Sequence, residues 1–215
     1  KTDGFDPVSV TDPLYVLLDR DKGYERLTER VAEAIAAFIR SEFRLRETRF
    51  HRFVFETEQL TDQELAGGLL FYGRGQCAAC HTGAYFSDLQ FHAIPFAQFG
   101  FGFNGFGIDY GRYNFTQDPQ DRYAFRTPPL YNVTKTAPFS HSGGEPDLAG
   151  AIRAHVDPLA EVDTSRLSAL DRAEVYQKIA RWSLEPSYAV ELSDAEIADL
   201  VAFLAALEFD PEPVR

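Results

Sequence analysis

The chain has 215 residues, of which 45% are apolar and 25% charged, so it can form one domain or a small pair with its own core. Its formal net charge of −12 disfavours nucleic acid and an anionic membrane surface as partners, and it favours a basic protein partner. No apolar run approaches the roughly 20 residues of a membrane-spanning helix, so we expect no membrane span. No apolar leader precedes a small-residue cleavage site, so we expect any signal peptide to have been removed already.

The N-terminal part of the chain predicts two helices. Residues 1–23 are rich in turn residues, whereas residues 26–43 carry apolar side chains at the spacing of one helix face. Those side chains are Val31, Ile35, Phe38 and Ile39. Further along, Thr61 and Glu64 have the spacing of a capping box and predict a helix that ends near residue 73. We expect Leu65, Leu69 and Tyr72 on the inner face of this second helix.

The middle of the chain is irregular, and the C-terminal part is helical again. Residues 85–131 are rich in aromatic residues, Gly and Pro, which predicts an irregular stretch. Its Gly- and Phe-rich tract at 99–107 predicts a loop wrapped over a cofactor, with Phe side chains as packing. The alternative is that tyrosines of this stretch relay oxidising equivalents, with Tyr110, Tyr113, Tyr123 and Tyr131 as candidates. Residues 164–182 predict a helix, and Ser193 and Glu196 form a second capping box before another. Since no stretch predicts a convincing β-sheet, the expected fold class is all-α with long irregular loops.

Both cysteines of the chain lie in one short motif. Cys77 and Cys80 are three residues apart, and His81 follows directly. Two cysteines are too few for a structural zinc site, and no α/β pattern of a thioredoxin-like redox pair accompanies them. The spacing instead predicts covalent attachment of one c-type haem, with a thioether at each sulfur and His81 on the iron from the same side. Haem attachment of this kind implies export, so we expect a periplasmic protein.

The ligand on the other side of the iron has to be something other than Met, because the chain has none. The remaining histidines are His51, His92, His141 and His155, and Tyr, Lys or water are further candidates. His155 lies on a short predicted helix that Asp147 could cap. Ala151 and Ile152 would share its inner face, where the imidazole needs a partner. Iron is one such partner, and a backbone carbonyl is the other.

Segments beyond the haem motif point to a family. Residues 127–133 read Thr-Pro-Pro-Leu-Tyr-Asn-Val, and residues 137–143 read Ala-Pro-Phe-Ser-His-Ser-Gly. With the haem motif, they resemble the C-terminal haem domain of bacterial di-haem cytochrome c peroxidases and MauG-type enzymes, over about residues 27–208. The resemblance implies a cytochrome c-like haem domain over residues 61–215, preceded by an N-terminal segment and linking helix over residues 1–60.

The resemblance also carries expectations for single residues. His155 stands where peroxidases of the family place a Met ligand, which makes it the expected distal ligand. Tyr131 stands where the family commonly has Arg, which puts a haem-propionate contact there in doubt. Thr136 and Pro138 match a segment whose main-chain carbonyls help to hold Ca²⁺ in di-haem peroxidases. Another ligand of that ion comes from the family's first haem domain, which has no counterpart in this sequence.

The function that follows is a haem c redox protein that passes or stores electrons for a peroxide-reactive partner haem. That partner is a second haem-bearing chain or a missing N-terminal haem domain, and a small cytochrome or copper protein is the expected electron donor. One alternative is a self-contained enzyme that reduces hydrogen peroxide or oxidises a protein at an open or displaceable sixth position. His141, His92 or Glu145 would then serve as its acid–base group. The other alternative is a simple electron carrier.

Overall fold

The computed structural model describes residues 20–42, 46–96, 98, 108–160, 165, 167–188 and 190–209. The contacts divide the chain into two units, with the boundary between Arg46 and Glu47. The Gly- and Phe-rich tract at 99–107, predicted to cover a cofactor, lies outside the described residues. Within the described ranges no helix is both long enough and apolar enough to cross a membrane.

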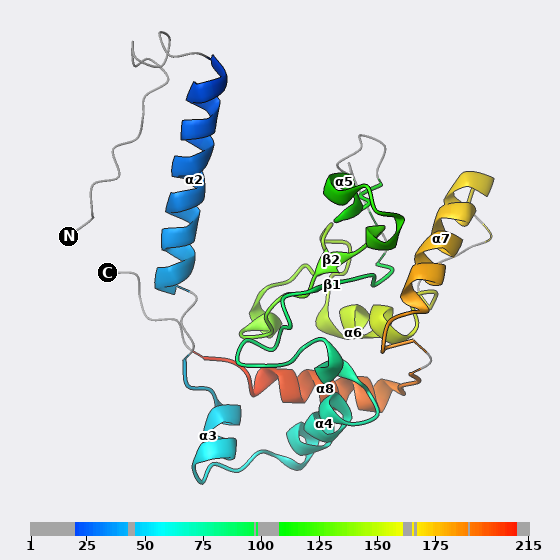
Figure 1. The fold of residues 1–215 in the computed structure, drawn as a ribbon. Helices are drawn as coiled ribbons and strands as arrows, with labels where there is room; N and C mark the ends of the chain where they lie inside the picture. The colour runs from blue at the N-terminus through cyan, green and yellow to red at the C-terminus, as the bar shows by residue number, and fades with distance from the viewer. Residues whose placement is uncertain are drawn as a thin grey trace. The chain divides into compact units, whose positions relative to one another are not determined.

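The described part of the first unit is one helix, α2 (Arg20–Glu42) (Figure 1). Its position confirms the helix predicted from the apolar spacing. The four apolar side chains of that spacing are each about half exposed, and they are Val31, Ile35, Phe38 and Ile39.

The second unit is built from short helices joined by long loops, which confirms the all-α class. Its longer helices are α3 (Arg49–Phe55), α4 (Asp62–Tyr72), α6 (Leu148–Val156), α7 (Ala169–Trp182) and α8 (Asp194–Ala205). Its short helical turns are η1 (Cys77–Ala79), α5 (Tyr113–Thr116), η2 (Pro119–Asp121) and η3 (Val133–Lys135). Two antiparallel strands, β1 (Phe91–His92) and β2 (Phe125–Arg126), pair Phe91 with Arg126 and His92 with Phe125. These two strands, with two residues each, form the one sheet found among the described residues.

The helix starts follow the capping residues. Thr61 and Glu64 form the predicted capping box at α4, and Ser193 and Glu196 form the one at α8. Asp147 caps α6 by accepting a hydrogen bond from the N–H of Gly150 at 2.8 Å. Each such cap stabilises its helix by about 1 kcal/mol, which is why these starts could be predicted locally.

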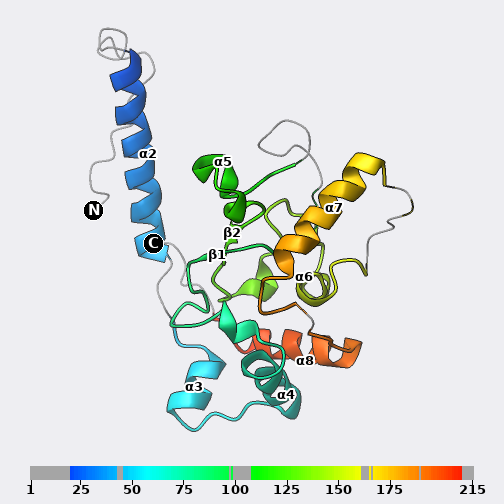
Figure 2. The ribbon, with the colours of Figure 1, turned by 45° about the vertical axis from the view of Figure 1, so that its right-hand side comes forward.

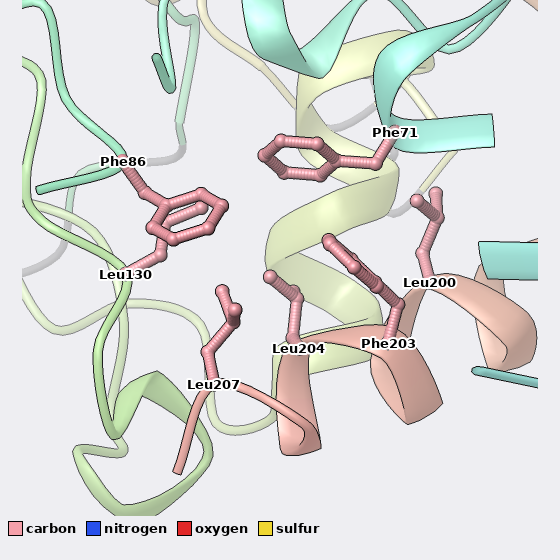
Figure 3. Close-up of a cluster of buried hydrophobic side chains, with 7 residues drawn as sticks. All are labelled: Phe71, Phe86, Leu130, Leu200, Phe203, Leu204 and Leu207. Atoms are coloured by element: carbon pink, nitrogen blue, oxygen red, sulfur yellow. The ribbon is translucent and has the colours of Figure 1, made fainter. Parts of the chain in front are cut away.

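Helices α4 and α8 lie side by side and build the core, with α6 on the other side of α8 (Figures 1 and 2). The buried cluster takes one ring from α4, three side chains from α8 and the rest from loops (Figure 3). Its members are Phe71, Phe86, Leu130, Leu200, Phe203, Leu204 and Leu207. The core therefore lies beneath the segment that carries the cysteine motif.

The predicted inner face of α4 is wrong. Leu65, Leu69 and Tyr72 are exposed by 40%, 73% and 55%. Gly67 and Phe71 face α8 instead, and a Cβ on Gly67 would lie 1.9 Å from the main-chain oxygen of Asp199. Because only a glycine permits this close approach, α4 turns the face of Gly67 and Phe71 to α8 and leaves Leu65, Leu69 and Tyr72 outside.

Candidate haem site

The cysteine motif is placed by a tight turn directly after α4. Gly75 donates its N–H to the carbonyl of Leu70 at 2.9 Å, and a Cβ on Gly75 would lie 2.6 Å from that oxygen. The turn η1 follows, and His81 donates its N–H to the carbonyl of Cys77 at 2.9 Å. Both sulfurs and the imidazole thereby line one cavity.

That cavity has a volume of about 440 Å³ and a mostly apolar lining. Phe71, Leu130 and Leu200 connect its wall to the core cluster, and Ile152 belongs to α6. A concave apolar site with a few polar groups suits a large planar cofactor. The predicted inner face of α6 is confirmed, because Ala151, Ile152 and His155 all line this cavity.

The rings of His81 and His155 both line this cavity and lie close to each other. Their centroids are 6.3 Å apart, with an angle of 56° between the ring planes. A metal ion lies about 2 Å from a ligating imidazole nitrogen, and the ring centre lies about 1.1 Å further, so two axial rings are about 6.2 Å apart. The separation therefore fits one metal ion held between the two imidazoles.

Hydrogen bonds fix which nitrogen of each ring is free. His81 Nδ1 lies 3.0 Å from the carbonyl of Phe86, and His155 Nδ1 lies 2.7 Å from the carbonyl of Ala151. A carbonyl only accepts, so Nδ1 carries the proton in both rings and donates it. The Nε2 lone pair of each ring is left to bind a metal, as in sites where a carbonyl orients the ligating histidine.

Burial keeps both imidazoles neutral. It lowers the pKa of His81 to about 4, with the nearby His155 adding to the effect, and it lowers the pKa of His155. A neutral imidazole is the form that binds a metal. At neutral pH the two rings are therefore in the ligating form.

The two cysteines are free thiols in the structure. Burial raises the pKa of Cys77 to about 11, and burial together with Asp88 and Glu185 raises that of Cys80 to about 12. Both sulfurs are thus protonated at neutral pH, which disfavours thiolate metal binding. Thioether formation leaves each sulfur uncharged, and this agrees with the apolar setting.

The other three histidines have different surroundings. His51 lies 3.2 Å through Nε2 from the hydroxyl of Tyr131 and does not line the cavity. His141 lines it, but its ring stacks on Phe125 at 3.8 Å and its Nε2 lies 2.8 Å from Gln98 Nε2. Of the four histidines considered for the sixth iron position, His155 is the one with a ring contact to His81.

Carboxylates occupy both nitrogens of His92. Its Nε2 lies 2.8 Å from Asp88 Oδ2, and its Nδ1 lies 2.7 Å from Glu185 Oε2. Sequence reasoning named His92 but missed both partners. The spacing of four residues between Asp88 and His92 was a weak signal, whereas Glu185, 93 residues further on, gave none.

Thr136 and Pro138, the residues matched to a calcium site, also line the cavity. The Thr136 hydroxyl donates to the carbonyl of Val133 at 2.9 Å. The calcium site stays a prediction. Among the described residues, the side chains that could together hold a metal ion are instead Cys80, His92 and Glu185, in the wall of the same cavity.

Comparisons with known proteins relate the chain to MauG and to cytochrome c peroxidases. No family model matches the chain. It is 29% identical over 171 residues to the methylamine utilization protein MauG of Methylorubrum extorquens, covering 78% of this chain and 41% of that protein. It is 32% identical over 127 residues to the cytochrome c peroxidase Ccp of Escherichia coli, covering 58% of this chain and 27% of that protein. The chain thus matches less than half the length of either relative.

Solved structures show the same fold. A MauG-like protein associated with microbial copper homeostasis superposes with a TM-score of 0.62 at 23% identity, over 76% of this chain and 52% of that one. The diheme peroxidase BthA from Burkholderia thailandensis superposes with a TM-score of 0.51 at 25% identity, over 75% of this chain and 46% of that one.

Proposed function

Because this chain is a haem c redox protein homologous to MauG and the di-haem cytochrome c peroxidases, we propose that it carries the electron-transfer haem of such a system. It would pass electrons to, or store them for, a peroxide-reactive haem on a partner. The observation that carries this proposal is the 6.3 Å separation of the His81 and His155 rings, with Nδ1 of each held by a carbonyl.

Four residues would hold the haem. Cys77 and Cys80 would carry it through thioethers, and His81 and His155 would bind its iron from opposite sides. When bound, the haem supplies one-electron oxidation and reduction. The chain's own contribution is to fix both imidazoles in the neutral form, and to exclude water with the apolar cavity wall.

With both His81 and His155 as ligands, the iron would have no coordination position left for peroxide. Peroxide would therefore react at the second haem, on another chain or on a further domain. His155 is held by the hydrogen bond from its ring to the carbonyl of Ala151 and by its place on α6. Such a ligand is not easily displaced from the iron, and this disfavours a self-contained peroxidase. We propose a periplasmic location and, as electron donor, a small cytochrome or copper protein.

A calcium ion is a separate part of the proposal. Main-chain carbonyls at Thr136 and Pro138 would provide some of its oxygen ligands, and the partner haem domain would provide another. Its support is the resemblance of this segment to the family. Metal analysis of the assembled protein before and after chelator treatment tests it, and a protein without calcium in both states would contradict it.

A visible spectrum of the haem-loaded protein tests the main proposal. We expect a low-spin ferric spectrum, slow cyanide binding and no rapid turnover of peroxide by this chain alone. The haem should also stay with the polypeptide after denaturation and acid–acetone extraction. A high-spin ferric spectrum with rapid peroxide turnover would favour the self-contained enzyme instead, and loss of all pigment on extraction would contradict covalent attachment.

A further inference from the structure

A second polar group lies in the wall of the same cavity. His92, on β1, is held between Asp88, in the loop after the haem motif, and Glu185, in the turn after α7. His92 and Glu185 line the cavity with Cys80, and ligand atoms of these three residues lie within 4.8 Å of one another. Haem attachment uses Cys80 but gives no role to Asp88, His92 and Glu185.

The hydrogen bonds define the charges of the group. Each ring nitrogen of His92 faces a carboxylate oxygen, and an ionised carboxylate only accepts, so both nitrogens must donate. The other oxygens accept from the main chain, Asp88 Oδ1 from Gln90 and Glu185 Oε1 from Ala93, both at 2.9 Å. The group is therefore one imidazolium between two carboxylates, with a net charge of −1.

The group is shielded from solvent. The side chains of Asp88, His92 and Glu185 are exposed by only 18%, 23% and 12%. Charges that are partly buried interact over several ångströms with little screening by salt. A change of charge at an iron in this cavity therefore changes how tightly the imidazole holds its proton.

We infer that the Asp88–His92–Glu185 group is a redox-linked proton site. At a pH high enough for His92 to lose its proton beside oxidised iron, His92 takes up one proton from solvent when the haem accepts one electron. This inference rests on the proposed haem. The electron comes from a one-electron donor such as a small cytochrome or copper protein, and oxidation releases both the electron and the proton. No bond is formed or broken apart from the N–H bond of His92.

The direction of the coupling follows from charge. Loss of the proton from His92 changes the charge of the group from −1 to −2, which is less favourable beside reduced than beside oxidised iron. His92 therefore holds its proton to higher pH in the reduced protein. Between the pKa of His92 in the oxidised protein and its pKa in the reduced protein, the midpoint potential falls as pH rises. The slope is at most the 59 mV that corresponds to a tenfold change in proton concentration for a one-electron couple.

The surroundings of His92 place the pH window in which the potential falls above the pKa that a histidine usually has. Burial lowers the pKa of His92, but the hydrogen bonds and charges of Asp88 and Glu185 outweigh burial and raise it. The sulfur of Cys80 lies in the same group and is uncharged at neutral pH, and the charge of Asp88 also reaches His81. From β2, Phe125 pairs with His92, and Arg126 is the next residue along that strand.

A metal ion fits the group less well. The two carboxylates lie at different nitrogens of one imidazole, Asp88 at Nε2 and Glu185 at Nδ1. An ion bound at one nitrogen would therefore contact only one of the two carboxylates. Cys80 would also be committed to a thioether. A proton, by contrast, suits every contact that the group makes.

The test is a spectroelectrochemical titration of the haem-loaded protein between about pH 5 and pH 10. The wild type should show a window in which the midpoint potential falls with pH, and His92→Gln should remove that window. His51→Gln is the matched control, because His51 lies outside the cavity lining, and it should keep the window. Asp88→Asn removes one carboxylate and should move the window to lower pH, which keeps the test sharp if His92→Gln does not fold.

Two results would overturn the inference. One is a wild-type potential that does not depend on pH across the range, and the other is a window that persists unchanged in His92→Gln or in Asp88→Asn. A titrating haem propionate would give that second result. A protein with no covalently bound haem would overturn the proposed function as well, whereas a loaded protein with a flat potential would overturn the redox-linked proton site alone.

Discussion

Trp182 donates its indole N–H to the main-chain carbonyl of His155 at 3.0 Å. The carbonyl belongs to the last turn of α6, where helix carbonyls lack partners within the helix. The same N–H also reaches Ser187 Oγ at 3.0 Å, and the indole is 7% exposed. The single tryptophan of the chain therefore holds the end of the helix that carries the candidate distal ligand.

Trp182→Phe should keep most of the packing and lose the donor. The His155 carbonyl would lose this partner, which should cost about 1 kcal/mol of the free energy of unfolding. Urea unfolding of the haem-loaded protein measures this loss, and cyanide binding should become faster as His155 is held less firmly. Tyr176→Phe, at a residue that is 66% exposed, should change neither quantity. Equal stabilities of Trp182→Phe and wild type would show that the indole hydrogen bonds contribute nothing.

His155→Ala should convert a low-spin ferric haem to high-spin, because His81 would be left as the one protein ligand. Visible and electron paramagnetic resonance spectra measure the conversion, and cyanide should then bind at least about tenfold faster because no ligand has to leave. His51→Ala, away from the cavity lining, should keep the wild-type spectrum. A low-spin spectrum that survives in His155→Ala would identify another residue as the sixth ligand.

The sequence predicted those features that depend on neighbouring residues. The capping boxes at Thr61 and Ser193 and the motif of Cys77, Cys80 and His81 are local, so spacing alone was sufficient. The inner face of α4 was mispredicted because it depends on the approach of Gly67 to Asp199, which lies on a helix far along the chain. A local apolar pattern cannot reveal such a contact.

The same limit applies to the polar groups of the site. Glu185 reaches His92 across 93 residues, and Trp182 reaches His155 across 27. Neither pair has a fixed spacing that sequence reasoning could recognise. The predicted ligands therefore came from motifs and from resemblance, whereas the residues that orient and charge the site came from the fold.

The corrected inner face of α4 gives a direct comparison of two substitutions. Phe71→Ala removes a ring that is 2% exposed and packs 5.1 Å from Phe203, so it should cost about 3–5 kcal/mol of the free energy of unfolding. Leu69→Ala, at a side chain that is 73% exposed, should change it by no more than about 0.5 kcal/mol. Urea denaturation of both variants measures the difference. Similar losses in the two variants would contradict the orientation of α4.

Glu64 makes part of the stability depend on pH. Its side chain is 8% exposed and accepts hydrogen bonds from Thr61 and, at 2.6 Å, from Arg49. Burial raises the pKa of Glu64, but these hydrogen bonds and the charge of Arg49 outweigh it, so the pKa lies below its usual value. A carboxyl with a depressed folded-state pKa stabilises the fold above its unfolded-state pKa, and this contribution is lost as pH falls through the folded-state value.

Glu64→Gln should therefore lower the free energy of unfolding near neutral pH, by about 1–2 kcal/mol, and lower it less and less as the solution is acidified below about pH 4.5. Urea denaturation of wild type and variant between about pH 3 and pH 7 gives the difference directly. Thr61→Ala removes the hydroxyl that helps to depress this pKa and leaves the main-chain donor in place, so Glu64→Gln in that background should show a smaller and less pH-dependent loss. The stabilisation by an ionised carboxylate disappears in acid, where the carboxylate is protonated. If Glu64→Gln lowered the free energy of unfolding equally at every pH, the charge of Glu64 would therefore contribute nothing.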